Sequence, residues 1–211
     1  MSFKKNKYQV LRNAISKDLA AFCYKYLQIS AEADNWMLNN GITHAGNKLV
    51  GNFNDPQVPN SYAKYADRVM ETLLVDTIKV MQKKTGLKLV PTYSYCRLYR
   101  TGNILKRHKD RPSCEISTTL NLGGDPWSIY LDPTGKKGQA GIEINLDPGD
   151  MLIYSGCDLE HWREEFTGQN CGQVFLHYNK KGSKLAKENY LDKRPLLGAP
   201  GWFKGVKIKH N

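Results

Sequence analysis

From Leu87 onward the chain consists of short segments rich in β-branched and aromatic residues, and this pattern restricts the fold more than any other feature. In Pro91–Arg100, the alternation places Tyr95, Arg97 and Tyr99 on one face of a strand. Turns rich in Gly, Pro and Asp separate further predicted strands at Ser117–Leu122, Trp127–Leu131, Gly141–Leu146, Met151–Tyr154 and Gln173–Tyr178. Six or more such strands at short intervals predict an antiparallel sandwich or jelly roll.

The residues before this region have helical periodicity. Over Asn13–Leu27 the predicted buried face holds Ile15, Leu19, Phe22, Cys23, Tyr26 and Leu27, with Ser16 as the N-cap. A second helix is expected from about Ser61 to Lys84, with Gly86 as its C-cap, after a loop over Asn39–Asn60. We therefore expect one domain over residues 1–211, with helical support (1–88), a β core (89–180) and a basic tail (181–211).

Composition narrows the class of protein. The net charge is +11, from 31 Lys and Arg against 20 Asp and Glu, which favours acidic partners such as nucleic acid, although lysines on solvated faces explain it equally well. The five cysteines show no C-x-x-C spacing, so we expect free thiols. No apolar run is long enough to span a membrane, and the N-terminus has no secretory pattern. A cytoplasmic protein that does not contact membranes is expected.

Three residues of the β region form a candidate metal-binding set. His108 and Asp110 are two positions apart, so on a strand both side chains would point to the same face. His161 follows the strand predicted at Met151–Tyr154 and could lie alongside them. Two imidazoles and one carboxylate leave three coordination positions open, which is typical of non-haem iron(II) oxygenases. His177 is the next choice of ligand, although its apolar neighbours favour a core position.

Several motifs in this order resemble one enzyme family. They are YRTGNILKRHKD (99–110), PWSIYLDP (126–133), LDPGDMLIYSG (146–156) and EHW (160–162). They resemble the prolyl 4-hydroxylase branch of the iron(II)- and 2-oxoglutarate-dependent oxygenases. The resemblance implies a mainly β fold with N-terminal helices, the double-stranded β-helix of jelly-roll or cupin type. It also implies that His108, Asp110 and His161 bind Fe(II), and that the cosubstrates are 2-oxoglutarate and O2, with ascorbate as a further candidate.

The sequence departs from this family where the distal carboxylate of 2-oxoglutarate would bind. The family places a lysine or arginine on the last barrel strand, whereas residues 170–179 contain neither and Gln173 stands near that place. We expect Tyr99 and Arg97 to take this role, with Tyr95, Thr119 and Gln173 in support. Alternatively, Arg97 belongs to a buried ion pair with Glu115 or Asp110.

The substrate is less well defined than the chemistry. The resemblance implies hydroxylation of a peptidyl proline, with Asn39–Asn60 and Asp132–Gly141 as loops that close over a peptide. Arg163 and Trp162 are candidate substrate contacts, although Arg163 could instead pair with Glu165 at the surface and Trp162 could be packing. Oxidation of a nucleic-acid base, hydroxylation of a free amino acid and a non-catalytic binding module are the alternatives. The oligomeric state is not defined by the sequence.

Overall fold

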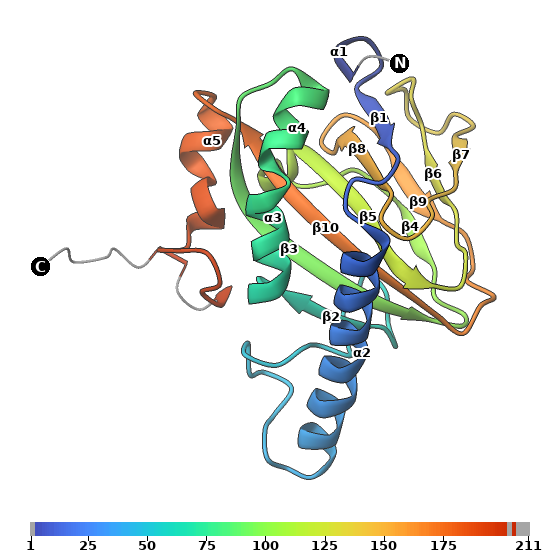
Figure 1. Cartoon of the computed structure of the whole chain (residues 1–211), viewed down its shortest axis with the longest axis vertical. Helices are drawn as coiled ribbons and strands as arrows, with labels where there is room; N and C mark the ends of the chain where they lie inside the picture. Colours follow the sequence, from blue (N-terminus) through green and yellow to red (C-terminus); the bar gives the residue numbers. More distant parts are fainter. Residues whose placement is uncertain (1–2, 202–203, 206–211) are drawn as a thin grey trace, which may run out of the picture.

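Two antiparallel sheets form the strand-rich part of the chain in a computed structural model that describes residues 3–201 and 204–205 (Figure 1). The major sheet has the order β1 (Tyr8–Leu11), β8 (Met151–Ser155), β5 (Ile116–Gly124), β10 (Asn170–Lys180), β3 (Leu89–Arg100) and β2 (Tyr62–Tyr65). The minor sheet has the order β4 (Leu105–His108), β9 (His161–Arg163), β6 (Ile129–Leu131) and β7 (Ile142–Ile144). The predicted jelly-roll type of architecture is therefore confirmed.

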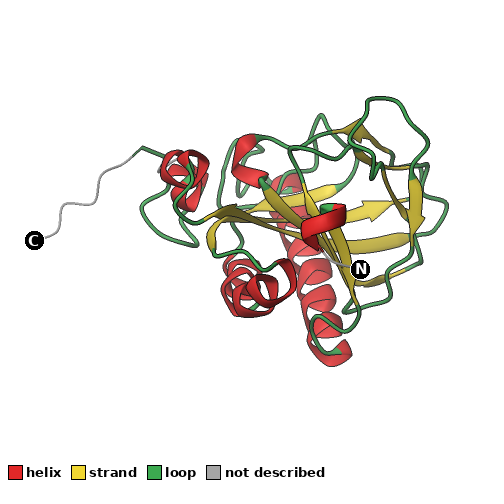
Figure 2. Cartoon of the chain, turned by 90° about the horizontal axis from the view of Figure 1, so that it is seen from above, coloured by secondary structure: helices red, strands yellow, loops and turns green. Residues whose placement is uncertain are grey.

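The two faces of the major sheet have different environments because side chains alternate along each strand. On β10, Val174, Leu176 and Tyr178 belong to the main hydrophobic core, which lies between this sheet and the helices. Phe175 and His177, on the other face of β10, line the cavity between the two sheets. Figure 2 shows the long helices together on one side of the strands. The inner face is thus left for polar chemistry.

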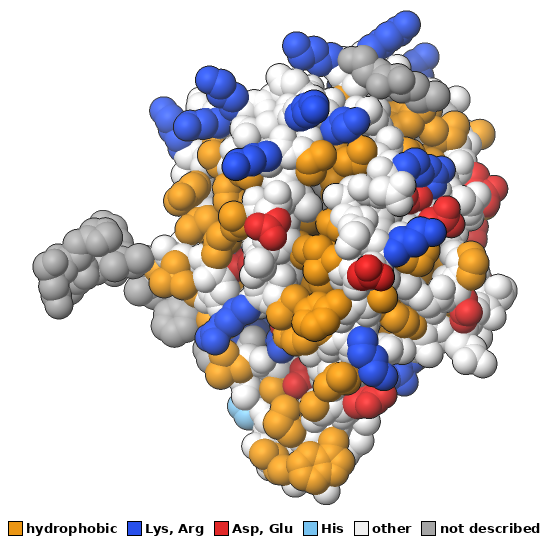
Figure 3. Space-filling view, in the orientation of Figure 1, with side chains coloured by type: hydrophobic (Ala, Val, Ile, Leu, Met, Phe, Trp, Pro, Cys, Tyr) orange, Lys and Arg blue, Asp and Glu red, His pale blue; other side chains and the backbone are white. Residues whose placement is uncertain are grey.

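Helix α2 (Lys17–Asn39) begins where the sequence predicts but buries a different face. Ser16 caps it, since its Oγ accepts a hydrogen bond from the Leu19 amide at 3.2 Å. The buried positions are Ala20, Cys23, Leu27, Ala31 and Asp34. The expectation that Leu19 and Phe22 are buried is wrong, because their exposed fractions are 38% and 63%. Small alanines allow close contact with the sheet, and apolar side chains remain exposed along α2 (Figure 3).

The predicted second helix is divided in the structure. Its first residues form β2, followed by α3 (Arg68–Asp76) and α4 (Ile78–Thr85). The two helices meet at Thr77, whose hydroxyl contacts the Leu73 carbonyl at 2.6 Å and the Tyr178 hydroxyl at 2.8 Å. Gly86 ends α4 with a φ of 70°, as predicted. The N-terminal part, expected as helical support over residues 1–88, contains β1 and β2 besides its helices, and these strands form both edges of the major sheet.

The remaining helices are short: α1 (Phe3–Asn6), α5 (Lys184–Glu188) and the 3₁₀ turns η1 (Pro112–Cys114) and η2 (Tyr190–Lys193). In the tail, Asp192 forms ion pairs with Arg111 at 2.8 Å and with Lys204 at 2.6 Å. The described part of the predicted irregular tail is therefore tied to the β core, while residues 202–203 and 206–211 lie outside the described residues. None of the described helices combines the length and apolar character that a membrane span needs.

Candidate metal centre

His108, Asp110 and His161 meet at one end of the minor sheet. His108 ends β4 and His161 begins β9, and the two are paired across these antiparallel strands. Their Nε2 atoms lie 3.8 Å and 3.6 Å from Asp110 Oδ1, and one ligand atom from each residue fits within 4.8 Å of the others. Asp110 lies after the end of β4, so the expectation that it shares a strand with His108 is wrong. A hydrogen bond of 2.9 Å from its amide to the Gly156 carbonyl brings it to the histidines instead.

Both imidazoles are oriented by their own backbone. His108 Nδ1 lies 2.7 Å from the Lys106 carbonyl, and His161 Nδ1 lies 3.2 Å from the Leu159 carbonyl. A carbonyl oxygen can only accept a hydrogen bond, so each Nδ1 carries a proton, and in the neutral form Nε2 is the nitrogen that presents a lone pair. Burial, together with the neighbouring His161, lowers the pKa of His108 and favours its neutral form. A neutral imidazole can offer this lone pair to a metal. Gln57 Nε2 lies 3.2 Å from the Nε2 atom of His108, and the Tyr154 hydroxyl lies 3.3 Å from that of His161.

The Asp110 carboxylate is held in its ionised form. Burial alone would raise the pKa of Asp110, but His161 and a hydrogen bond from Ser117 outweigh burial and keep that pKa well below its usual value. Ser117 Oγ donates to Oδ2 at 2.7 Å, which leaves Oδ1 directed at the histidines. Ser117 also contacts His177 Nδ1 at 3.0 Å. His177 is buried, which lowers its pKa to about 4, so it is neutral at pH 7.

Gly156 is required by the close approach of the chain around Asp110. A Cβ at this position would lie 2.4 Å from Asp110 Oδ2 and 2.4 Å from the Cys114 carbonyl oxygen. It would also lie 2.7 Å from Ser117 Oγ. No side chain larger than hydrogen fits here without a shift of these groups, so Gly156 sets the position of the carboxylate.

A cluster of charged residues joins the strands that carry the two histidines. Arg107, which precedes His108, contacts Glu160 Oε2 at 2.6 Å and the buried Asp132 Oδ2 at 2.7 Å. Its guanidinium lies 4.1 Å from the ring centroid of Trp162. Trp162 also stacks on Tyr130 and is not among the residues that line the cavity. The position of Trp162 therefore gives no support to the expected contact with substrate.

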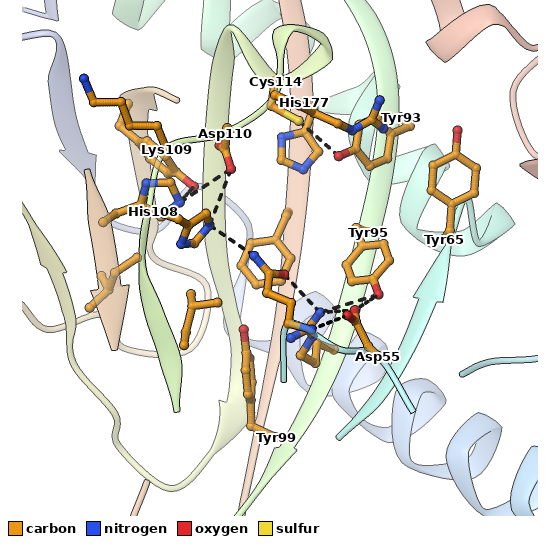
Figure 4. A pocket seen from close by; sticks show the side chains of 18 residues that line it. Asp55, Tyr65, Tyr93, Tyr95, Tyr99, His108, Lys109, Asp110, Cys114 and His177 are labelled. Atoms are coloured by element: carbon orange, nitrogen blue, oxygen red, sulfur yellow. Dashed lines mark hydrogen bonds and ion pairs between the residues drawn. The ribbon is translucent and has the colours of Figure 1, made fainter. Parts of the chain in front are cut away.

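A cavity of about 400 Å³ extends from the three residues across the interior. Tyr95, Arg97 and Tyr99, which alternation along β3 places on one face, all line this cavity together with Tyr93. Figure 4 shows Tyr93 and Tyr95 on the side away from His108. Asp55 and Gln57, from the predicted loop Asn39–Asn60, also line it. Gln57 Nε2 lies 3.2 Å from His108 Nε2, so this loop reaches the candidate centre. No residue of the second predicted loop, Asp132–Gly141, appears among the described residues that line the cavity.

The arginine that the sequence associates with 2-oxoglutarate already has a carboxylate partner. Arg97 Nη2 lies 2.5 Å from Asp55 Oδ2, and the Tyr95 hydroxyl donates to the same oxygen at 2.5 Å. The alternative that Arg97 forms a buried ion pair with Glu115 or Asp110 names the wrong acidic residue, because the partner is Asp55. Glu115 pairs instead with Lys180 at 3.1 Å.

Thr119, Gln173 and Arg163 lie deeper in the interior. Thr119 Oγ1 donates to Gln173 Oε1 at 3.1 Å, and Arg163 Nη2 approaches Thr119 Oγ1 at 3.5 Å. Burial lowers the pKa of Arg163. The alternative of a surface pair between Arg163 and Glu165 is wrong, because only 1% of Arg163 is exposed. These three residues form a buried polar group rather than a surface for a large substrate.

Four residues that shape the site were missed by sequence reasoning: Asp55, Gln57, Ser117 and Gly156. Asp55 and Gln57 reach the cavity from a loop more than 40 residues before the H-x-D motif, with no local pattern to mark them. Gly156 directly follows the buried strand β8, and a glycine at the end of such a strand is a usable signal of close backbone approach.

Comparison by sequence gives no relatives. No protein-family model matches the chain, and no curated protein matches it. Any evidence of kinship therefore comes from the fold.

Solved structures resemble most of this architecture. A prolyl-4-hydroxylase from Pseudomonas putida is 11% identical with a TM-score of 0.59, covering 85% of this chain and 96% of that one. HygX from Streptomyces hygroscopicus, solved with nickel and 2-oxoglutarate bound, is 11% identical with a TM-score of 0.61, covering 85% of each chain. SnoN, a non-heme alpha-ketoglutarate-dependent epimerase of nogalamycin biosynthesis, is 10% identical with a TM-score of 0.61, covering 94% and 91%. The chain therefore has the double-stranded β-helix fold of the iron(II)- and 2-oxoglutarate-dependent oxygenases.

Proposed function

We propose that this chain is an iron(II)- and 2-oxoglutarate-dependent dioxygenase that hydroxylates an unactivated C–H bond. The observation that carries the proposal is the convergence of His108 Nε2, His161 Nε2 and Asp110 Oδ1 within 4.8 Å at the end of a cavity. Two imidazoles and one ionised carboxylate suit Fe(II) and leave three coordination positions for cosubstrate and dioxygen. The fold, shared with enzymes of this class, supports the same conclusion.

A second group of potential ligands fits a metal less well. Asp110, Cys114 and His177 also lie within 4.8 Å of one another. Burial raises the pKa of the Cys114 thiol, and a metal would require the thiolate. His177 Nδ1 is already engaged by Ser117. The first group needs no thiolate, and its two Nε2 atoms lie 3.8 Å and 3.6 Å from Asp110 Oδ1, so we assign the metal to His108, Asp110 and His161.

When bound, Fe(II) and 2-oxoglutarate would allow O2 to act as the oxidant: one oxygen atom would enter succinate as 2-oxoglutarate loses CO2, and the other would be inserted into the C–H bond of the substrate. The contribution of the chain is to orient and enclose these groups. The carbonyls of Lys106 and Leu159 hold the two imidazoles, and Ser117 holds the carboxylate. The buried aromatic residues Tyr99 and Tyr154 restrict water inside the cavity.

For the substrate, we propose a prolyl residue of a peptide or protein. Tyr65, Tyr93 and Tyr95 give the cavity an aromatic lining suited to an apolar ring. Of the three Lys and Arg residues that line it, Arg97 pairs with Asp55 and Arg111 with Asp192, so most of this positive charge is already neutralised. This arrangement favours a neutral substrate over a nucleic acid, despite the net charge of +11. The similarity to a prolyl-4-hydroxylase supports the same choice.

The first test is anaerobic reconstitution with Fe(II) and 2-oxoglutarate, followed by visible absorption spectroscopy. One equivalent of iron and a weak charge-transfer band are expected for the wild type, and both should be lost in His161→Ala. The matched control is His177→Ala, which removes another buried histidine of the interior and should retain one equivalent of iron. Bound iron without any band would refute the assignment of 2-oxoglutarate as cosubstrate.

The second test concerns the substrate. Succinate formation should rise with a proline-containing peptide, and the peptide should gain the mass of one oxygen atom. The same peptide with alanine in place of proline should leave succinate formation at its background. Stimulation by free proline but not by the peptide would instead favour the free amino acid as substrate.

A further inference from the structure

Helix α2 carries a line of exposed apolar side chains. Phe22, Ile29 and Trp36 are 63%, 53% and 59% exposed. They follow one another at intervals of seven residues, which is almost two turns of an α-helix, so they lie in a row along one side. Leu19, which is 38% exposed, borders this row near the start of the helix. We call these four residues the α2 stripe.

The α2 stripe is not an edge of the hydrophobic core. The face of α2 that packs on the major sheet contains Ala20, Leu27 and Ala31. At 3.6 residues per turn, the stripe points roughly 150° away from these residues, toward solvent. Figure 1 shows the second half of α2 extending beyond the strands, and Figure 3 shows hydrophobic side chains as far as that end. A partner can therefore approach the stripe without meeting the sheets.

The arrangement of the α2 stripe differs from that of other exposed apolar residues. Val75, Ile104 and Leu196, for example, are exposed at single positions on separate segments. Single apolar residues are ordinary on a protein surface, whereas a contiguous apolar patch marks an interaction site. The stripe is such a patch, because its four side chains lie on one helix over about 26 Å, from Leu19 to Trp36.

The area of the α2 stripe suits a protein interface. An aromatic side chain buries 150–250 Å² when fully covered, so Phe22 and Trp36 offer roughly 240 Å² at their exposed fractions of 63% and 59%. Leu19 and Ile29 add roughly 100 Å². A standard interface buries about 800 Å² on each partner, of which a little over half is apolar. The stripe therefore supplies most of the apolar area that a stable dimer needs.

Two charged residues beside the α2 stripe indicate what the partner is. Lys25 and Glu32 are exposed and seven residues apart, so they lie along the same flank of the stripe. In the part of the chain that the structure describes, neither residue forms an ion pair. This flank thus has one positive and one negative group without partners, and a second α2 has the complementary charges.

An antiparallel second copy of α2 satisfies both the apolar row and the charges. With a two-fold axis at Ile29, Phe22 faces Trp36 of the second copy, because each lies seven residues from the axis. The same rotation keeps equal flanks together, so Lys25 comes beside Glu32 of the second copy, and the contact occurs twice by symmetry. Parallel helices would bring opposite flanks together, and Lys25 would not meet Glu32.

We propose that two copies of this chain form a symmetric dimer in which their α2 helices pack antiparallel. The α2 stripe forms the core of the interface, and two Lys25–Glu32 ion pairs lie at its flank. The proposal is independent of the proposed function, because no residue of the candidate metal centre takes part.

The first test measures the molar mass of the full chain by light scattering from about 1 to 100 µM, where interfaces of modest area associate. The wild type should rise from 24.0 kDa toward twice this mass. Ile29→Glu places two like charges at the axis and should stay at 24.0 kDa. The matched control is Val75→Glu, at an exposed apolar position of α3, which should dimerise like the wild type. A monomeric wild type, or an Ile29→Glu variant that still dimerises, would overturn the proposal.

A charge exchange tests the antiparallel arrangement. Lys25→Glu brings like charges together at two symmetric contacts and should weaken dimerisation about tenfold. Adding Glu32→Lys reverses both charges and should restore the affinity to within about threefold of the wild type. Both positions are exposed, so the variants should fold, which circular dichroism can verify. A double variant that dimerises as weakly as Lys25→Glu would refute the antiparallel pairing.

Discussion

Replacement of Gly156 by alanine should disturb the metal centre through a single methyl group. The added Cβ would lie 2.4 Å from Asp110 Oδ2, whereas ordinary contacts begin at 3.4 Å, so the carboxylate must retreat by about 1.0 Å (3.4 − 2.4). The carbonyl of Cys114, also at 2.4 Å, is backbone and cannot move aside easily. A ligand displaced by this amount should reduce metal affinity by about 10- to 100-fold. The crowding should also reduce the free energy of unfolding by about 1–3 kcal/mol.

Calorimetric titration with Mn(II) and urea unfolding of the same samples separate these two effects. Gly172→Ala is the matched control, because its Cβ would lie 2.5 Å from Tyr24 Cδ2 on the helix-facing side of β10, away from the metal centre. It should lower stability to a similar extent and leave Mn(II) affinity unchanged. The reasoning fails if Gly156→Ala binds Mn(II) as tightly as the wild type, or if Gly172→Ala loses as much affinity.

Three further outcomes are expected. Ser117→Ala removes the hydrogen bond to Asp110 and should weaken Mn(II) binding about tenfold. Thr118→Ala, on the opposite face of β5, should leave Mn(II) binding unchanged. Equal losses of Mn(II) affinity in the two variants, measured by calorimetry, would argue against a positioning role for Ser117. Arg107→Ala leaves the buried Asp132 without its cation and should lower the free energy of unfolding in urea by about 3 kcal/mol. The control Lys106→Ala, at an exposed position, should change this free energy little. Similar free energies of unfolding for the two variants would contradict the prediction. Burial alone would raise the pKa of Asp192, but Arg111 and Lys204 keep it below the ordinary 3.8, so its stabilisation is complete above that pH and is lost as pH falls further. The stability difference between wild type and Asp192→Asn should thus be constant from about pH 7 to 5 and shrink below about pH 4; a difference that grows on acidification would refute the sign.

The sequence predicts the strands and the candidate metal ligands best where side-chain type and strand periodicity point to the same structure. Most of the long strands were predicted because their alternating residues face a core on one side and a polar interior on the other. The H-x-D motif and the later histidine were recognised by residue type and spacing. The strands that carry them, β4 and β9, were missed, since they are four and three residues long and mostly polar. Their pairing depends on contacts between distant segments.

The partners of the arginines could not be predicted for a related reason. Arg97 and Arg163 are similar in sequence context, each on a strand near a candidate metal ligand. Their difference arises from one acidic residue, Asp55, which a distant loop brings to Arg97 and not to Arg163. The residues around each arginine in the sequence do not show where a distant loop will lie in the fold. The sequence therefore indicates the candidate buried arginines but does not show which of them has a carboxylate partner.

The alternation along β10 has a consequence for how this protein can evolve. Residues of even number, such as Val174, Leu176 and Tyr178, belong to the hydrophobic core, whereas the odd-numbered Gln173, Phe175 and His177 face the interior. Mutations at even-numbered and odd-numbered positions should therefore be selected for different properties, the first for stability of the fold and the second for the shape and polarity of the interior. New specificities can arise by drift at odd positions while the even positions preserve the scaffold.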